Sequence, residues 1–167
     1  LETGLRSITA IEVDAQGIVY FAEIIDGATH IRRITPDGFL ETVFAGIEDR
    51  ENPETYLDTV LDLVIGPDQA MYVTETNRSV IRRIDANGEL EVYVGRLRTF
   101  GYEGDGGPAR QALIARPSGL TFGPDGSLYF AERDNEIIRR VGPDGIISTI
   151  AGVGQTFSPY TGEGGPA

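Results

Sequence analysis

Glutamates and arginine pairs recur along this chain at positions where their charges could neutralise one another. Each glutamate ends a segment that also carries a tyrosine, and an Ile-Arg-Arg-Ile or Ile-Arg-Arg-Val segment follows it. Buried charges are costly unless an opposite charge compensates them, and neighbouring residues of a strand point to opposite faces. One arginine of each pair can therefore reach the glutamate. We predict three structural ion pairs between strands: Glu23 with Arg33, Glu75 with Arg83, and Glu132 with Arg140.

The same arginines could instead form a ring that binds an anion. The chain has 14 basic residues, all of them arginine, against 26 acidic ones, so its formal net charge is −12. This charge opposes binding to phosphates. We therefore expect no nucleic-acid partner, and RNA binding is the weakest of the functions considered.

Residues suited to catalysis or metal binding are few. His30 is the single histidine, and the chain has no cysteine, which excludes disulfides and thiolate metal sites. Calcium needs about six to eight oxygen ligands in a defined array, and the acidic loop at residues 48–51 shows no regular spacing. A catalytic residue should break a repeat, because the reaction takes place only once. We therefore expect no catalytic, cofactor-binding or metal-binding residue.

Aromatic residues in two linkers are not explained by the strand pattern. On a rigid scaffold, aromatic loop residues are candidates for contacts with a partner. Alternatively they hold each linker against its own sheet, since they precede a Gly-x-Gly-Gly-Pro-Ala segment in both places. The candidate contact residues are Phe100, Tyr102, Phe157 and Tyr160.

The elements that must position these residues are short strands in repeated units. Residues 118–152 contain four β-rich segments, and two of the turns between them read Gly-Pro-Asp-Gly. In such a turn proline presets φ, aspartate bonds its own backbone and glycine accepts a positive φ. Two turns of this kind between β-rich segments predict a four-stranded meander. The unit recurs at residues 63–95 and 11–46, so we predict an all-β fold with three four-stranded units.

The linkers repeat with the strands. Gly-Asp-Gly-Gly-Pro-Ala at residues 104–109 returns 58 positions later as Gly-Glu-Gly-Gly-Pro-Ala at residues 162–167. A four-stranded repeat of this length is typical of propeller blades. We interpret the whole chain, residues 1–167, as one partial propeller. Blade one spans about residues 5–46, blade two about 57–95 and blade three about 116–152, and residues 153–167 are a linker to a further blade.

The sequence PSGLTFGPDGSLYFAERDNEIIRRVGPDGIISTIAG at residues 117–152 resembles an NHL repeat. The linker GYEGDGGPARQALIARPSG at residues 101–119 is similar to those of bacterial NHL proteins and of the NHL propellers of teneurin-like and YD-repeat proteins. The resemblance covers almost the whole chain. It implies an NHL-type β-propeller in which three blades are half of a six-bladed ring. It also implies a large secreted or cell-surface bacterial parent protein, a location for which the residues themselves give no support.

Three blades cannot close a ring, since propellers have roughly four to eight. The two end blades would expose apolar faces, which soluble proteins avoid. The expected partners are therefore further blades, either from the same longer chain or from a second copy in a homodimer around the propeller axis. No segment is long and apolar enough to span a membrane as a helix, so we expect no membrane insertion.

These observations favour a non-catalytic scaffold or interaction module that binds protein or carbohydrate and needs no cofactor. The alternative is a metal-dependent hydrolase or lactonase, or a lyase-like propeller enzyme, with an axial site. The lyases that resemble NHL proteins use several histidines, which this chain lacks, whereas lactonase-type sites use Glu, Asn and Asp and remain open. The acids expected on the innermost strands are Glu12, Asp14, Asp58 and Asp62.

Overall fold

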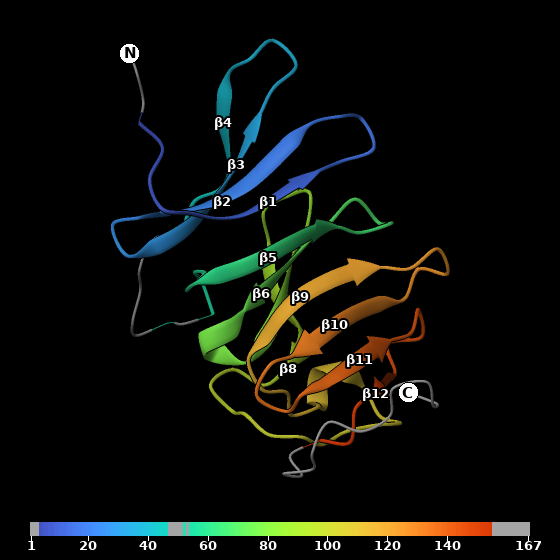
Figure 1. Ribbon diagram of the computed structural model, residues 1–167. Coiled ribbons are helices and arrows are strands. Elements are labelled where there is room, and N and C mark those ends of the chain that lie inside the picture. Colours follow the sequence, from blue (N-terminus) through green and yellow to red (C-terminus); the bar gives the residue numbers. More distant parts are fainter. Residues whose placement is uncertain (1–3, 47–51, 53, 155–167) are drawn as a thin grey trace.

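The computed structural model describes residues 4–46, 52 and 54–154 of the 167-residue chain (Figure 1). They form three four-stranded antiparallel sheets in which strands that follow one another in the chain pair with one another. The first sheet consists of β1 (Ile8–Val13), β2 (Val19–Ile25), β3 (Ala28–Ile34) and β4 (Leu40–Phe44). The second consists of β5 (Val60–Ile65), β6 (Met71–Glu75), β7 (Val80–Ile84) and β8 (Leu90–Gly95). The third consists of β9 (Pro117–Phe122), β10 (Leu128–Glu132), β11 (Ile137–Val141) and β12 (Ile147–Ala151). The predicted all-β fold with three four-stranded units is confirmed.

The turns within the sheets use the side chains that the sequence places there. Between β1 and β2, Asp14 Oδ1 accepts the N–H groups of Gln16 at 2.9 Å and Ile18 at 2.8 Å. Between β9 and β10, Asp125 Oδ1 accepts the N–H of Ser127 at 3.1 Å, and Gly126 takes a φ of 78°. In both turns an aspartate satisfies backbone donors, and a glycine, Gly17 or Gly126, adopts a positive φ.

A register shift recurs between the third and fourth strands of every sheet. It lies beside the first arginine of each Arg-Arg pair, at Ile31/Arg32, Ile81/Arg82 and Ile138/Arg139. A bulge of this kind bends its strand and redirects the neighbouring side chains. Its repetition at equivalent positions shows that the three sheets share one detailed architecture.

The sheets stand side by side in chain order, with the second between the first and the third (Figure 1). Their first strands are neighbours, since β1 contacts β5 and β5 contacts β9. One core, which includes Leu57, Val60 and Met71, fills the space between the first and second sheets. A second core, which includes Tyr72 and Phe130, fills the space between the second and third. Both faces of the second sheet are therefore covered.

Burial at equivalent positions depends on whether a neighbouring sheet is present. Two sets of aliphatic residues occupy matched places in the pairing of the second and third strands. In one set Ile31 and Ile81 are fully buried and Ile138, on the outer side of the third sheet, is 43% exposed. In the other Ile84 and Val141 are buried and Ile34, on the outer side of the first sheet, is 41% exposed. The two terminal sheets thus present the apolar face that the internal contacts bury elsewhere.

The described residues contain only two short 3-10 turns as helix, at Thr76–Arg78 and Ala109–Gln111. Within this part of the chain no helix has the length and apolarity needed to cross a membrane.

Candidate functional site

The recurring glutamates pair with the first arginine of each Arg-Arg segment, so the predicted partners Arg33, Arg83 and Arg140 were wrong by one residue. The Oε–Nη1 distances are 2.7 Å for Glu23–Arg32, 3.2 Å for Glu75–Arg82 and 3.1 Å for Glu132–Arg139. The register explains the difference. In the third sheet Phe130 lies opposite Arg139, and Phe130 and Glu132 share one face of β10. Arg140 lies opposite Tyr129, on the other face.

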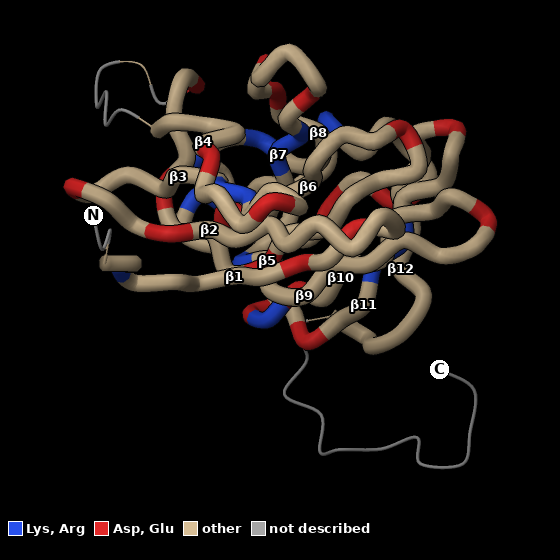
Figure 2. Tube along the Cα trace, turned by 90° about the horizontal axis from the view of Figure 1, so that it is seen from above, with Lys and Arg blue, Asp and Glu red and all other residues tan. Residues whose placement is uncertain are grey.

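The second arginines make more exposed pairs with acids of the turns and outer strands. The N–O distances are 2.7 Å for Arg33–Glu41, 2.7 Å for Arg83–Asp68 and 3.0 Å for Arg140–Asp125. Hydrogen bonds from Ser127 and Arg140 lower the pKa of Asp125 to about 2. All six arginines of the three pairs thus lie beside carboxylates, and the acids are spread over turns and strand ends (Figure 2). This arrangement does not support an anion-binding ring.

In the third sheet the buried pair holds the linker that precedes the sheet. The backbone of residues 104–109 runs along the free edge of β12, where Gly106 N–H donates to Ile147 O at 2.8 Å. Ile147 N–H in turn donates to Gly107 O at 3.0 Å. The Gly-Asp-Gly-Gly-Pro-Ala segment therefore extends the hydrogen bonding of the sheet that follows it in the chain.

Asp105 is the side chain that fixes this linker. Its Oδ1 lies 2.5 Å from Arg139 Nη2, and its Oδ2 accepts the N–H of Thr149 at 3.0 Å. Burial acts to raise the pKa of Asp105, but the hydrogen bonds from Thr149 and Arg139 outweigh it and hold that pKa below its ordinary value. The ionised carboxylate therefore joins β11, β12 and the linker.

Arg139 and Glu132 are both completely buried beneath the linker. Arg139 donates to Leu113 O and to Glu103 O, each at 3.3 Å, and Glu132 accepts the N–H of Ala115 at 2.8 Å. Burial raises the pKa of the Glu132 carboxyl. Two buried charges are thus compensated by each other and by linker backbone groups, as buried ion pairs require.

The second sheet binds its shorter linker in a related way. Arg82 Nη2 donates to Glu54 O at 2.7 Å, and Glu75 accepts the N–H of Asp58 at 2.7 Å. Arg78 adds a second buried cation, with Nη1 at 3.2 Å from Glu75 Oε1 and its guanidinium 4.1 Å from the centroid of the Tyr56 ring. Burial raises the pKa of Glu75 here too.

Sequence reasoning missed Arg78 and Asp105. Arg78 stands three residues after Glu75, where the third sheet has Asn135, which donates to Glu132. The available signal was this common spacing from the glutamate. For Asp105 the signal was that an acid is the only charged residue of the repeated Gly-x-Gly-Gly-Pro-Ala segment.

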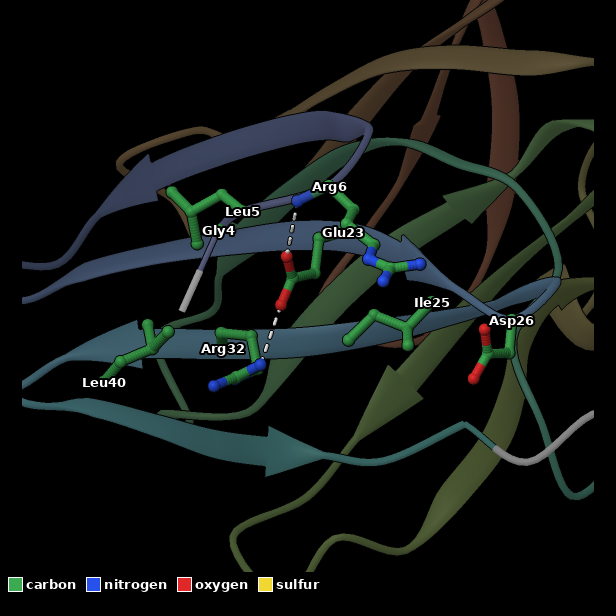
Figure 3. A pocket seen from close by; sticks show the side chains of 8 residues that line it. All are labelled: Gly4, Leu5, Arg6, Glu23, Ile25, Asp26, Arg32 and Leu40. Carbon is green, nitrogen blue, oxygen red and sulfur yellow. Dashed lines mark hydrogen bonds and ion pairs between the residues drawn. The ribbon is translucent and has the colours of Figure 1, made fainter. Parts of the chain in front are cut away.

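The first sheet carries the same ion pair, but an open cavity lies beside it (Figure 3). The cavity encloses about 150 Å³ between residues 4–6, the turn at Asp26, and Glu23, Arg32 and Leu40. Glu23 accepts the N–H of Arg6 at 3.2 Å, which corresponds to its bond from Ala115 in the third sheet. The Arg32 side chain is 18% exposed, whereas those of its equivalents are 1% and 0% exposed.

The aromatic contact candidates lie in different environments. Tyr102 Oη lies 3.1 Å from Thr149 Oγ1, and the Arg139 guanidinium is 5.5 Å from the centroid of the Tyr102 ring. Tyr102 thus packs against the third sheet, whereas Phe100 is 77% exposed. Phe157 and Tyr160 lie outside the described residues.

Three of the four acids considered for an axial site have structural partners. Asp14 binds the backbone of its own turn, and Asp58 lies 3.7 Å from Arg78 Nε. Asp62 Oδ2 accepts the N–H of Leu120 at 2.8 Å and so links β5 to β9, and burial raises the pKa of Asp62. Glu12 is half-buried on β1. Among residues 4–46, 52 and 54–154, no three His, Cys, Asp or Glu side chains come together in a way that could hold a metal ion.

Comparison with known sequences finds similarity to teneurins, while no family model matches the chain. Teneurin-3 of Danio rerio is 33% identical over 74% of this chain, and human teneurin-4 is 30% identical over 90%. Teneurin-m of Drosophila melanogaster is 28% identical over 85%. The chain spans only 5 to 6% of the length of these relatives.

Comparison with solved structures shows the fold. A protein of unknown function from Bacteroides thetaiotaomicron aligns with a TM-score of 0.74 at 23% identity, over 89% of this chain and 36% of its own. Virginiamycin B lyase from Staphylococcus aureus aligns with a TM-score of 0.59 at 22% identity, over 89% and 42%. A gluconolactonase from Xanthomonas campestris aligns with a TM-score of 0.60 at 19% identity, over 89% and 50%. The three repeated sheets and these likenesses together place the chain among the β-propeller proteins.

Proposed function

We propose that this chain is a section of an NHL-type propeller of the teneurin kind and acts as a non-catalytic interaction module. The polar side chains that recur in blades two and three support this, because they bind strands and linkers. The similarity to teneurins over 74 to 90% of the chain supports the NHL assignment. The rigid propeller would present its linker loops, including the exposed Phe100, to a protein or glycan partner.

The observation that carries the proposal is the apolar face on each terminal blade. Ile34 and Ile138 are exposed, whereas their equivalents in the same chain are buried by an adjacent blade. These faces would bind further blades, which belong either to a longer chain or to a second copy of this one. Two copies of three blades would make the six-bladed ring expected from the NHL resemblance.

The enzymatic alternative has no residues assigned to it. The lyase and gluconolactonase likenesses are below 25% identity and concern the fold alone. Within the described residues three of the candidate axial acids, Asp14, Asp58 and Asp62, are engaged in turn, strand or ion-pair contacts. No observation of the site favours this alternative.

The test is the mass of the chain in solution by light scattering behind a sizing column, with binding of a hydrophobic dye measured in parallel. We expect twice the mass of a single chain for a closed pair, or a single-chain mass with strong dye binding if blades of a longer protein are needed. Ile34→Asp and Ile138→Asp should abolish pairing or dye binding, whereas Ala86→Asp in an exposed turn should change neither. A single chain that binds no dye and is unaffected by these substitutions would contradict the proposal.

A further inference from the structure

The cavity on blade one occupies the place where blade three receives its linker. Arg32 lies opposite Thr42 in the pairing of β3 with β4, as Arg139 lies opposite Thr149 in the pairing of β11 with β12. Leu40 lies opposite Ile34, as Ile147 lies opposite Val141. Three residues of blade three that bind residues 104–109 therefore have counterparts on blade one: Arg139 in Arg32, Ile147 in Leu40 and Thr149 in Thr42.

On blade one these counterparts lack the linker contacts among the described residues. Arg139 Nη2 contacts Glu103 O and Asp105, and Arg82 Nη2 contacts Glu54 O. The Arg32 ion pair, by contrast, uses Nη1 and leaves the rest of the guanidinium toward the cavity (Figure 3). Leu40, the counterpart of Ile147, lines the same cavity. The cavity thus brings together an arginine and an apolar side chain, as blade three does where it binds a backbone segment with one acidic side chain.

The chain contains a second segment with the required sequence. Residues 162–167 read Gly-Glu-Gly-Gly-Pro-Ala, which differs from residues 104–109 only by Glu163 in place of Asp105. Residues 162–167 follow blade three as residues 104–109 follow blade two. Since residues 104–109 bind the blade that comes next, residues 162–167 should bind the next blade in the ring. Blade one lies on the far side of blade two from blade three, so blade one of the same molecule is not the adjacent blade, whereas blade one of a second copy can be (Figure 1).

We propose that the cavity at Arg32 is the acceptor for residues 162–167 of a second copy of this chain. Glu163 of that copy takes the position that Asp105 has at Arg139, bound by Arg32 Nη2 and the N–H of Thr42. The two glycines and Pro166 follow the free edge of β4 at Leu40. In a two-fold pair each copy supplies one segment and one acceptor, so the contact is made twice. This inference rests on the proposed function, because it names the segment by which one half-ring joins the other.

The experiment measures the dissociation constant of self-association of the full chain by sedimentation velocity. Glu163→Arg should raise this constant by about tenfold or more, because it places a cation against Arg32 at both contacts. Glu163→Asp, which reproduces the filled site of blade three, should leave self-association intact. Glu89→Arg has the same charge change in an exposed turn and should have no comparable effect.

A second arm uses a labelled synthetic peptide with the sequence of residues 155–167. It is titrated by fluorescence polarisation into the full chain carrying Glu163→Arg. Arg32→Lys in that chain keeps a cation for Glu23 but removes the forked guanidinium, and should weaken peptide binding by about tenfold. The peptide with glutamine in place of its glutamate should bind comparably weakly.

The outcomes separate this inference from the proposed function. Self-association that is unchanged by Glu163→Arg, or a peptide that binds equally well to the Arg32→Lys chain, would overturn the linker site while leaving the apolar-face proposal standing. A chain that stays single and does not bind the peptide would also overturn the linker site. The Ile34 and Ile138 variants then decide the proposed function by themselves.

Discussion

Removal of the Arg139 side chain should cost far more stability than removal of its neighbour Arg140. Arg139→Met deletes a buried cation and leaves Glu132, which is fully buried, with an uncompensated charge. It also removes the guanidinium that binds Asp105 and two linker carbonyls. Breaking a buried pair in this way costs about 3–5 kcal/mol. Arg140→Met breaks an exposed pair with Asp125, which contributes little to stability because solvent screens it.

The assay is urea unfolding of the full chain, followed by circular dichroism at one fixed protein concentration. In a thermal melt of the same chain, the loss of stability for Arg139→Met should appear as a fall in Tm of about 10 °C. The double variant Glu132→Gln/Arg139→Met should recover a large part of the loss, because the glutamine leaves no buried charge. If Arg139→Met costs no more than Arg140→Met, the linker is not held by the buried pair and the reasoning fails.

Two further predictions concern the backbone and acid stability. Gly95→Ala should destabilise the chain by more than the roughly 1 kcal/mol expected for Gly88→Ala. Both glycines have a positive φ, but a Cβ on Gly95 would lie 2.7 Å from a backbone oxygen, whereas a Cβ on Gly88 meets nothing within 4 Å; equal urea midpoints would contradict this. Burial raises the pKa values of Glu75 and Glu132, so as the pH falls the folded chain binds a proton at each carboxyl before the unfolded chain does. Lowering the pH from 7 towards 5 should therefore not reduce the free energy of unfolding through these two groups. The pKa of Asp125 is lowered to about 2, so the stabilisation given by its ionised carboxylate is present above the ordinary aspartate pKa of about 3.9 and is lost as the pH falls towards 2. Urea midpoints that drop steeply between pH 7 and 5 would contradict the expected acid stability.

The repeated strands were predictable because each level of the sequence indicates the same structure. Turn residues, β-rich segments and their recurrence all favour a four-stranded unit, and local features of this kind need no knowledge of distant contacts. The arginine that meets each glutamate was not predictable in the same way. Strand alternation says only that one arginine of a pair faces the glutamate, and the length of the turn between the two strands decides which one.

The linker contacts depend on tertiary structure alone. Nothing local to residues 104–109 shows that Gly106 and Gly107 bond to Ile147, some 40 residues further along the chain. The repeated Gly-x-Gly-Gly-Pro-Ala sequence indicated a linker between blades, and the structure adds that the acid of residues 104–109 reaches a buried arginine. The recurrence therefore indicated that the segment has a role in the fold, and only the packed sheets showed what it binds.

The linkers of the second and third sheets are attached to the sheet that follows them in the chain, and this changes where the repeating module begins and ends. The module includes residues 96–116 with the third sheet, so it starts 21 residues before the first strand of that sheet. During synthesis on the ribosome the linker emerges first, and blade three has all its linker contacts available once Ala151 has been added. Blades two and three can thus form their linker contacts in the order of translation. A duplication or deletion between Gly95 and Arg96 would preserve the module, whereas one between Ala115 and Pro117 would separate Glu132 and Arg139 from the linker groups that bind them.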